Sequence, residues 1–288
     1  MPLKSDALKT VWERIPLVVR AVVIGFLVFA IAGSLVWAAF LIFLPPPWPF
    51  LAMAVVLVVY VQYLRGRWWP GSTVEFKRTN FRATRMPVRV WIWSLLAAVF
   101  VVLVVQSGLV VTFRIVEFPA EAWSLGFDFG GTATWVAWFF VVVAAATAAI
   151  TEEVGFRGYM QVPLENRYGP GVAITIVSVV FVVSHLHQAW APLVLIHVFG
   201  VSVLWGILAR VSGSLIPGII SHTLVDVVNF SYWWTDIAGR FEMETIERTG
   251  VDRHFVLWVL ILLLSLIAFW RASIRTHEAG QRSNNRTD

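Results

Sequence analysis

Two adjacent carboxylates and an arginine follow an apolar run in the middle of the chain. Glu152 and Glu153 come directly after residues 135–150, and Arg157 stands four residues after Glu153. A charge near the centre of a membrane helix costs on the order of 2.5–3.5 kcal/mol on insertion scales, so two consecutive glutamates require a reason. On a helix, Glu153 can pair with Arg157, whereas Glu152 is rotated away by about 100°. A capping ion pair at the membrane interface would explain the pair but not Glu152, which we expect to be available for chemistry.

Histidines occur in the apolar runs that follow. His185 stands near the end of one run, two residues before His187, and His222 stands inside another with Asp226 four residues after it. The i,i+4 spacing puts His222 and Asp226 on one helical face, where an aspartate can orient the imidazole ring. His187 is predicted to bond a backbone carbonyl, and His197, which has no acidic companion on its helix, is predicted to pack. Carboxylates and imidazoles inside a membrane bundle indicate chemistry rather than anchoring.

The composition is that of a membrane protein. The 288 residues are 59% hydrophobic and 14% charged, and the mean hydropathy is +0.78, which no soluble domain of this size would show. The apolar runs are continuous, unlike the alternating strands of a transmembrane β-barrel. The absence of Cys excludes disulfides, thiolate nucleophiles and cysteine metal ligands. The sequence also lacks a His-Glu-x-x-His motif, a Gly-x-Ser-x-Gly turn and a Walker loop.

Eight apolar runs are candidates to cross a bilayer, which requires roughly 20 residues in a helix. The expected fold is therefore an all-α membrane protein, a polytopic helical bundle of about eight transmembrane helices. The second run is short, so we expect it to tilt or to re-enter the membrane. The predicted spans are Leu17–Leu44, Phe50–Leu64, Trp91–Val111, Trp135–Thr151, Val172–His187, Pro192–Ala209, Leu215–Phe230 and Phe255–Trp270.

Basic residues alternate between the loops that join these spans. Four of the 22 Lys and Arg residues lie in the odd-numbered loops, and the other 18 lie in the termini and the even-numbered loops. This bias predicts that both termini are cytoplasmic, with a bacterial plasma membrane as the expected location. The net charge of +5 then reflects orientation and contact with membrane lipids rather than nucleic-acid binding.

The chain is expected to divide into three parts. Residues 1–130 hold the N-terminal transmembrane helices and a basic cytoplasmic loop, 131–235 hold a catalytic core, and 236–288 hold the last transmembrane helix and a polar tail. The polar tail is expected to be disordered.

Three motifs in this core resemble those of the CPBP family, the prenyl-protein CAAX endopeptidases and their bacterial Abi relatives. Glu-Glu-x-x-Phe-Arg-Gly-x-Met-Gln begins at Glu152, Phe-x-x-x-His runs from Phe181 to His185, and His-x-x-x-Asp runs from His222 to Asp226. Each motif alone is a weak signal, but the three stand in the family's order. The resemblance covers about a third of the chain and implies an intramembrane endopeptidase.

The resemblance also implies roles for the first two motifs. Glu152 with His185 would activate the attacking water, while Glu153 and Arg157 would hold the site. The substrate would be a peptide or protein at the membrane, and the motifs do not distinguish a prenylated CAAX protein from another membrane-associated peptide. They carry no information on the oligomeric state.

The third motif departs from the family. His222 and Asp226 would stabilise the oxyanion or help to bind a metal, but asparagine is usual where Asp226 stands, and Asn229 one turn later is an alternative. A carboxylate and two imidazoles can also hold Zn²⁺ with an open position. Glu152, His185 and His222 are therefore candidate ligands in a metalloprotease, beside a mechanism in which Glu152 and His185 act on water directly.

Two other functions remain open on the sequence. One is a non-catalytic immunity or scaffold protein of the same fold, which the presence of Glu152, His185 and His222 disfavours. The other is a proton-coupled transporter, because buried Glu and His also form proton relays. Internal repeats with broken helices would indicate a transporter, and the sequence shows no convincing repeat.

Overall fold

The structure is a computed structural model that describes residues 12–45, 47–65, 74–75, 79, 86–118, 133–186, 192–235, 237–239 and 243–284. Within these ranges the chain is helical and has no strand, which confirms the all-α class predicted from the composition. The elements in order are α2 (Leu17–Val28), η1 (Phe29–Leu35), α3 (Val36–Phe43), α4 (Trp48–Leu64), α6 (Val88–Ile115), α7 (Thr134–Glu152), η3 (Glu153–Met160), α8 (Gln161–Tyr168), α9 (Pro170–Ser184), α10 (Pro192–Ser212), α11 (Ile216–Val228), η5 (Asn229–Trp233), α12 (Ile246–Thr249) and α13 (Arg253–Asn284), where η marks π-helical turns.

Five helices of the described chain are long and apolar enough to cross a membrane. Two further apolar helices, α4 and α9, have 17 and 15 residues. At 1.5 Å per residue they reach about 26 and 23 Å, less than the ~30 Å of a bilayer's hydrocarbon core. Each of the eight predicted runs contains a helix, but a count of eight spans is not confirmed. The five spanning helices are Leu17–Phe43, Val88–Ile115, Thr134–Tyr168, Pro192–Ser212 and Arg253–Arg282.

The helix that carries the two glutamates does not end after them. It passes from α7 through η3 into α8, and it ends only where Gly169 adopts a φ of 82° before Pro170. The span predicted as Trp135–Thr151 therefore ends too early, since the spanning helix runs to Tyr168. The wider turns of η3 continue through two glycines because tertiary packing offsets their low helix propensity. All residues of η3 except Tyr159 are buried.

Helix α2 packs on η3 with the two backbones in direct contact. A Cβ atom on Gly25 would lie 2.6 Å from the carbonyl oxygen of Gly155, and a Cβ on Gly155 would lie 2.6 Å from that of Gly25. On another side, a Cβ on Gly218 of α11 would lie 2.9 Å from Oε2 of Glu153. Glycines on α2 and α11 thus let both helices close around η3.

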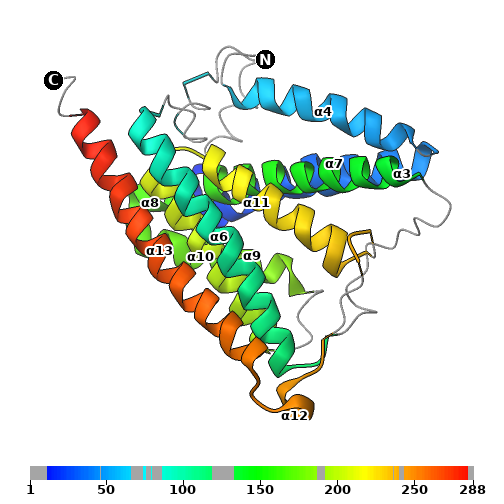
Figure 1. Cartoon of the computed structure of the whole chain (residues 1–288). Coiled ribbons are helices and arrows are strands. Elements are labelled where there is room, and N and C mark those ends of the chain that lie inside the picture. The colour runs from blue at the N-terminus through cyan, green and yellow to red at the C-terminus, as the bar shows by residue number, and fades with distance from the viewer. Residues whose placement is uncertain are drawn as a thin grey trace, which may run out of the picture.

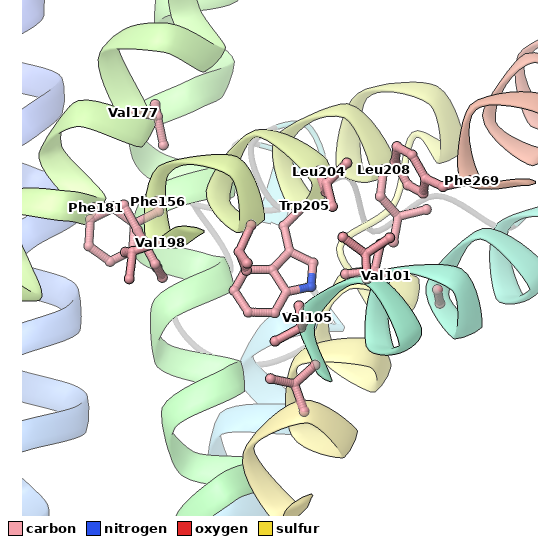
Figure 2. Packing of buried hydrophobic residues seen from close by; sticks show 14 of the residues in the cluster. Val101, Val105, Phe156, Val177, Phe181, Val198, Leu204, Trp205, Leu208 and Phe269 are labelled. Carbon is pink, nitrogen blue, oxygen red and sulfur yellow. The ribbon is translucent and has the colours of Figure 1, made fainter. Parts of the chain in front are cut away.

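A second layer of helices completes the bundle. The long helix α13 packs along α6, and α10 packs on both α6 and α9 (Figure 1). Figure 2 shows Trp205 of α10 among buried side chains of this layer, with Val105 of α6 on one side and the Phe156–Phe181 pair on another. The core therefore lies directly behind η3.

One end of α6 is fixed by a buried arginine. Arg114 donates hydrogen bonds to both carboxylate oxygens of Asp252, at 3.1 and 2.8 Å, and to Oγ1 of Thr249 at 2.7 Å. These bonds fix the entry of the chain into α13. The hydrogen bond from Arg114 lowers the pKa of the Asp252 carboxyl below its ordinary value.

The glycine contact between α2 and η3 gives a test of the packing. We expect Gly25→Ala to destabilise the protein by about 1–3 kcal/mol, as overpacking of a filled core does, because the new methyl group meets backbone rather than a flexible side chain. Gly171→Ala in α9 is the matched control, since a Cβ there meets nothing within 4 Å. Thermal melting in detergent should separate the two variants, and equal melting temperatures would contradict the contact.

Candidate active site

Four of the six predicted site residues come from three helices beside η3. Glu152 is the last residue of α7, His185 follows directly after α9, and His222 and Asp226 lie on α11. Glu152, His222 and Asp226 are buried. The helix junction at Glu152 therefore brings together residues that are up to 74 positions apart in the sequence.

Behind the site lies a fully buried ion pair. The side chains of Glu153 and Arg157 have no exposed surface, and their Oε1 and Nη1 atoms lie 3.2 Å apart, as the i,i+4 spacing predicts. The other terminal nitrogen of Arg157, Nη2, donates to Oγ of Ser202 at 2.9 Å and to its carbonyl oxygen at 3.1 Å. The guanidinium also lies over the ring of Phe181, 4.8 Å from its centroid, and 5.5 Å from that of Trp205. These contacts hold a charge pair that lipid or an apolar core would otherwise exclude.

The ion pair fixes the orientation of His222. Nδ1 of His222 lies 3.0 Å from Oε1 of Glu153. A carboxylate paired with arginine accepts hydrogen bonds, so Nδ1 donates, and in the neutral ring Nε2 carries the lone pair. The ring also stacks on Trp205 at 3.8 Å with an angle of 16°. Nε2 is thereby directed toward Oε2 of Glu152 at 3.8 Å and Oδ2 of Asp226 at 3.6 Å.

His185 is oriented in a similar way by the end of α9. Its Nδ1 lies 2.8 Å from the carbonyl oxygen of Phe181, one of the four carbonyls at a helix end that lack a partner in the helix. A carbonyl only accepts, so Nδ1 donates here too and Nε2 carries the lone pair in the neutral ring. Nε2 lies 4.0 Å from Oε2 of Glu152. The ring also stacks on that of Phe181 at 4.3 Å, so the two named residues of the second motif contact each other directly.

Glu152 lies where these two imidazoles converge. Its Oε2 is buried and has no hydrogen-bond partner among the residues that the structure describes. The carboxylate borders a cavity of about 300 Å³ whose wall also includes His185, His222 and Asp226. Its other wall residues include Phe29, Val105, His197, Trp205, Asn229 and Phe230.

The structure therefore sorts the predicted residues into two groups. Glu152, His185, His222 and Asp226 line the cavity, whereas Glu153 and Arg157 lie behind it. The predicted position of His187 falls outside the described residues.

Two residues of the cavity wall were not singled out as such by the sequence. His197 packs closely against Gly108, as predicted, and it also lies in the wall. Trp205 was overlooked; a Trp well inside an apolar helix, away from the membrane interfaces where indoles gather, was the available signal.

A metal site is not supported by this geometry. No group of three or more His, Cys, Asp or Glu side chains in the described ranges is arranged to hold a metal ion. The ligand set predicted from the sequence, Glu152, His185 and His222, therefore remains a prediction.

The buried ion pair can be tested by removing its cation. Arg157→Met leaves Glu153 buried without its counter-charge, which costs about 3–5 kcal/mol, so the melting temperature in detergent and the folded yield should fall sharply. The matched control is Arg275→Met, which breaks an exposed pair with Glu278 and should change stability by about 0–1 kcal/mol. Similar melting of both variants would contradict the burial of the pair.

Comparison with known proteins relates these residues to one protein family. Residues 133–228 match the model of the Rce1-like type II CAAX prenyl endopeptidases. The match contains all six predicted site residues and most of the cavity wall. No curated protein and no solved structure shows significant similarity to the chain. About a third of the chain is therefore similar to the Rce1-like type II CAAX prenyl endopeptidases, which confirms the resemblance to the CPBP family indicated by the three motifs.

Proposed function

We propose that the protein is an intramembrane endopeptidase that cleaves a peptide bond of a membrane-associated substrate with a water activated by Glu152 and His185. The observation that carries the proposal is the convergence of Oε2 of Glu152 with Nε2 of His185 and of His222, at 4.0 and 3.8 Å, at the wall of one cavity. The similarity of residues 133–228 to a protease family supports the same reaction class.

The arrangement suits a water that must lose a proton. A carboxylate and a neutral imidazole both accept hydrogen bonds, so Glu152 and His185 can each accept one hydrogen bond from the same water. A lone pair of the water oxygen then points toward the cavity. The water oxygen attacks the peptide carbonyl carbon while its proton passes to Glu152. When the C–N bond breaks, Glu152 returns this proton to the leaving amine. Glu152 therefore both accepts and returns the proton, and it ends each reaction cycle ionised.

The remaining residues hold the base in place. The ion pair of Glu153 with Arg157 keeps His222 at the side of Glu152. Asp226 lies against Nε2 of His222 and can stabilise the imidazole whenever a proton reaches it. A site held in this way loses little free energy to reorganisation during the reaction.

A second cavity suggests how a substrate with a hydrocarbon portion would bind. A cavity of about 380 Å³ also borders Glu152 and shares Phe29, Ala148 and Phe230 with the first. Its wall is mostly apolar and includes Trp37, Leu41 and Phe140. Glu152 therefore borders two cavities with mostly apolar walls, and the first of them also contains His185, His222 and Asp226. A peptide whose neighbouring side chain or prenyl group is hydrocarbon fits this combination, with the peptide bond beside Glu152.

The membrane setting completes the proposal. Five helices of spanning length support an integral membrane protein with lipid around it. Cytoplasmic termini remain a prediction from the distribution of basic residues. The proposal favours an enzyme over the scaffold and transporter alternatives because one cavity combines a general base with the groups that orient it.

Removal of the base tests the function. Glu152→Gln keeps the shape of the side chain but cannot accept a proton, so turnover of a fluorogenic prenylated CAAX-type peptide in detergent should fall at least ~100-fold with the melting temperature preserved. Glu247→Gln, an exposed residue of α12, is the control and should keep full turnover. Wild-type turnover in Glu152→Gln would contradict the proposal. Metal content and turnover after exhaustive chelation, measured on the same samples, decide whether the predicted zinc is needed.

A further inference from the structure

A series of hydrogen bonds between side chains leads from the core to the cavity, through residues that have no role in the water activation proposed above. The indole Nε1 of Trp233 donates to Oε1 of Gln106 at 3.2 Å, and Nε2 of Gln106 donates to Oδ1 of Asn229 at 3.0 Å. Asn229 lies in the wall of the cavity that holds Glu152. Polar side chains joined in series inside a membrane bundle require a reason, as the two glutamates did.

The direction of this series is fixed by its first member. An indole nitrogen only donates, so Gln106 must present its oxygen to Trp233 and its amide nitrogen to Asn229. Asn229 must then present its oxygen to Gln106. The NH₂ group of Asn229 therefore ends this series of hydrogen bonds and is the group available to the cavity. It can only donate.

Rigid elements hold both ends of the series. Trp233 is 4% exposed and packs against the rings of Phe113 and Phe118 at 5.2 and 5.7 Å. Asn229 begins the π-helical turns of η5, two helical turns after His222, so the two side chains lie on the same face of the helix. π-helical turns of this kind recur at functional sites.

The proposed reaction needs a donor that the catalytic residues do not supply. As the water attacks, the carbonyl oxygen of the substrate gains negative charge and requires an oriented hydrogen-bond donor. The Nδ1–H groups of His185 and His222 are bonded to Phe181 and Glu153. The indole N–H of Trp205 is bonded to Ser221, and Glu152 only accepts when it acts as the base. A hydrogen on Oδ2 of Asp226 would face the lone pair of Nε2 of His222, which lies 3.6 Å away.

We propose that the side-chain NH₂ of Asn229 donates to the oxyanion of the scissile carbonyl, and that Gln106 and Trp233 are positioning residues that aim it. The inference rests on the proposed function. It assigns the donor to Asn229 rather than to Asp226, whose carboxylate lies against His222. No proton is transferred in this step, because the N–H···O bond strengthens as charge develops on the oxygen.

The donor is tested by substituting Asn229. Asn229→Ala and Asn229→Asp should both lower kcat about 10²–10³-fold with little change in KM, because the lost bond forms mainly in the transition state. The matched control is Asn166→Ala on the exposed side of α8, which should leave kcat unchanged. A loss confined to KM would overturn the assignment, as would full activity of Asn229→Ala while His197→Ala is inactive.

The positioning role is tested at Gln106. Gln106→Glu accepts from both Trp233 and the NH₂ group of Asn229, so it should turn the oxygen of Asn229 to the cavity and lower kcat nearly as much as Asn229→Ala. Gln106→Met only releases Asn229 and should lower kcat less. Combining Gln106→Glu with Asn229→Ala should lower kcat no further than Asn229→Ala alone. Additive losses would show that Gln106 acts independently of Asn229 and would overturn the role.

The same assay separates this inference from the function on which it rests. If Glu152→Gln abolishes turnover while Asn229→Ala keeps it, the endopeptidase stands and only the donor assignment fails. If Glu152→Gln turns over normally, or the wild-type protein cleaves no peptide, the proposed function fails and the donor assignment fails with it. Melting temperatures of all variants exclude loss of fold as the cause of any fall in kcat.

Discussion

The structure depends on a fully buried ion pair between Glu153 and Arg157. Taking two charges out of water carries a penalty that Coulomb attraction alone does not offset, so such a pair persists only when further contacts satisfy it. Here Ser202 accepts two hydrogen bonds from the guanidinium of Arg157, and the rings of Phe181 and Trp205 lie over it. Glu153 in turn accepts a hydrogen bond from His222. The buried pair thus sets the orientation of the imidazole ring of His222. Without the pair, His222 would lose the hydrogen bond that sets the orientation of its ring.

The location of the pair also explains the helix that carries it. A span ending after Glu152 would leave both charges at an interface, where water could reach them. The helix instead continues to Tyr168, and the π-helical turns of η3 place Glu152 toward the cavity while Glu153 and Arg157 face the core. Glycines on neighbouring helices make the close approach feasible, with Gly25 against the backbone of η3 and Gly218 against Glu153. Small residues at helix contacts are the usual means of close packing within a membrane.

The sequence could predict what lies within one helix. The i,i+4 spacings of Glu153 with Arg157 and of His222 with Asp226 are realised as close pairs, because helical geometry alone sets them. What depends on contacts between helices was not predictable. The bond from Nδ1 of His222 to Glu153 joins residues 69 positions apart, and the bond from Gln106 to Asn229 joins residues 123 apart.

The early end predicted for the fourth span has the same physical origin. Continuation of the helix through η3 was hidden because glycines and charges usually mark a helix end, and only packing against other helices overrides that preference. The position of His197 in the cavity wall was not predictable from α10 alone, because α6, α7, α9 and α11 also contribute to that wall. Membership of a cavity is a property of the bundle, not of one segment.

The central claim is that carboxylate and carbonyl partners fix both imidazoles with Nδ1 protonated, so that both Nε2 lone pairs face Glu152. Nitrogen-15 NMR of histidine-labelled protein in detergent at pH 9 reads this tautomer directly, because a protonated and an unprotonated ring nitrogen differ widely in chemical shift. Single substitutions of His185 and His222 assign their signals. The account predicts a protonated Nδ1 and an unprotonated Nε2 for both residues. A protonated Nε2 on either ring would contradict it.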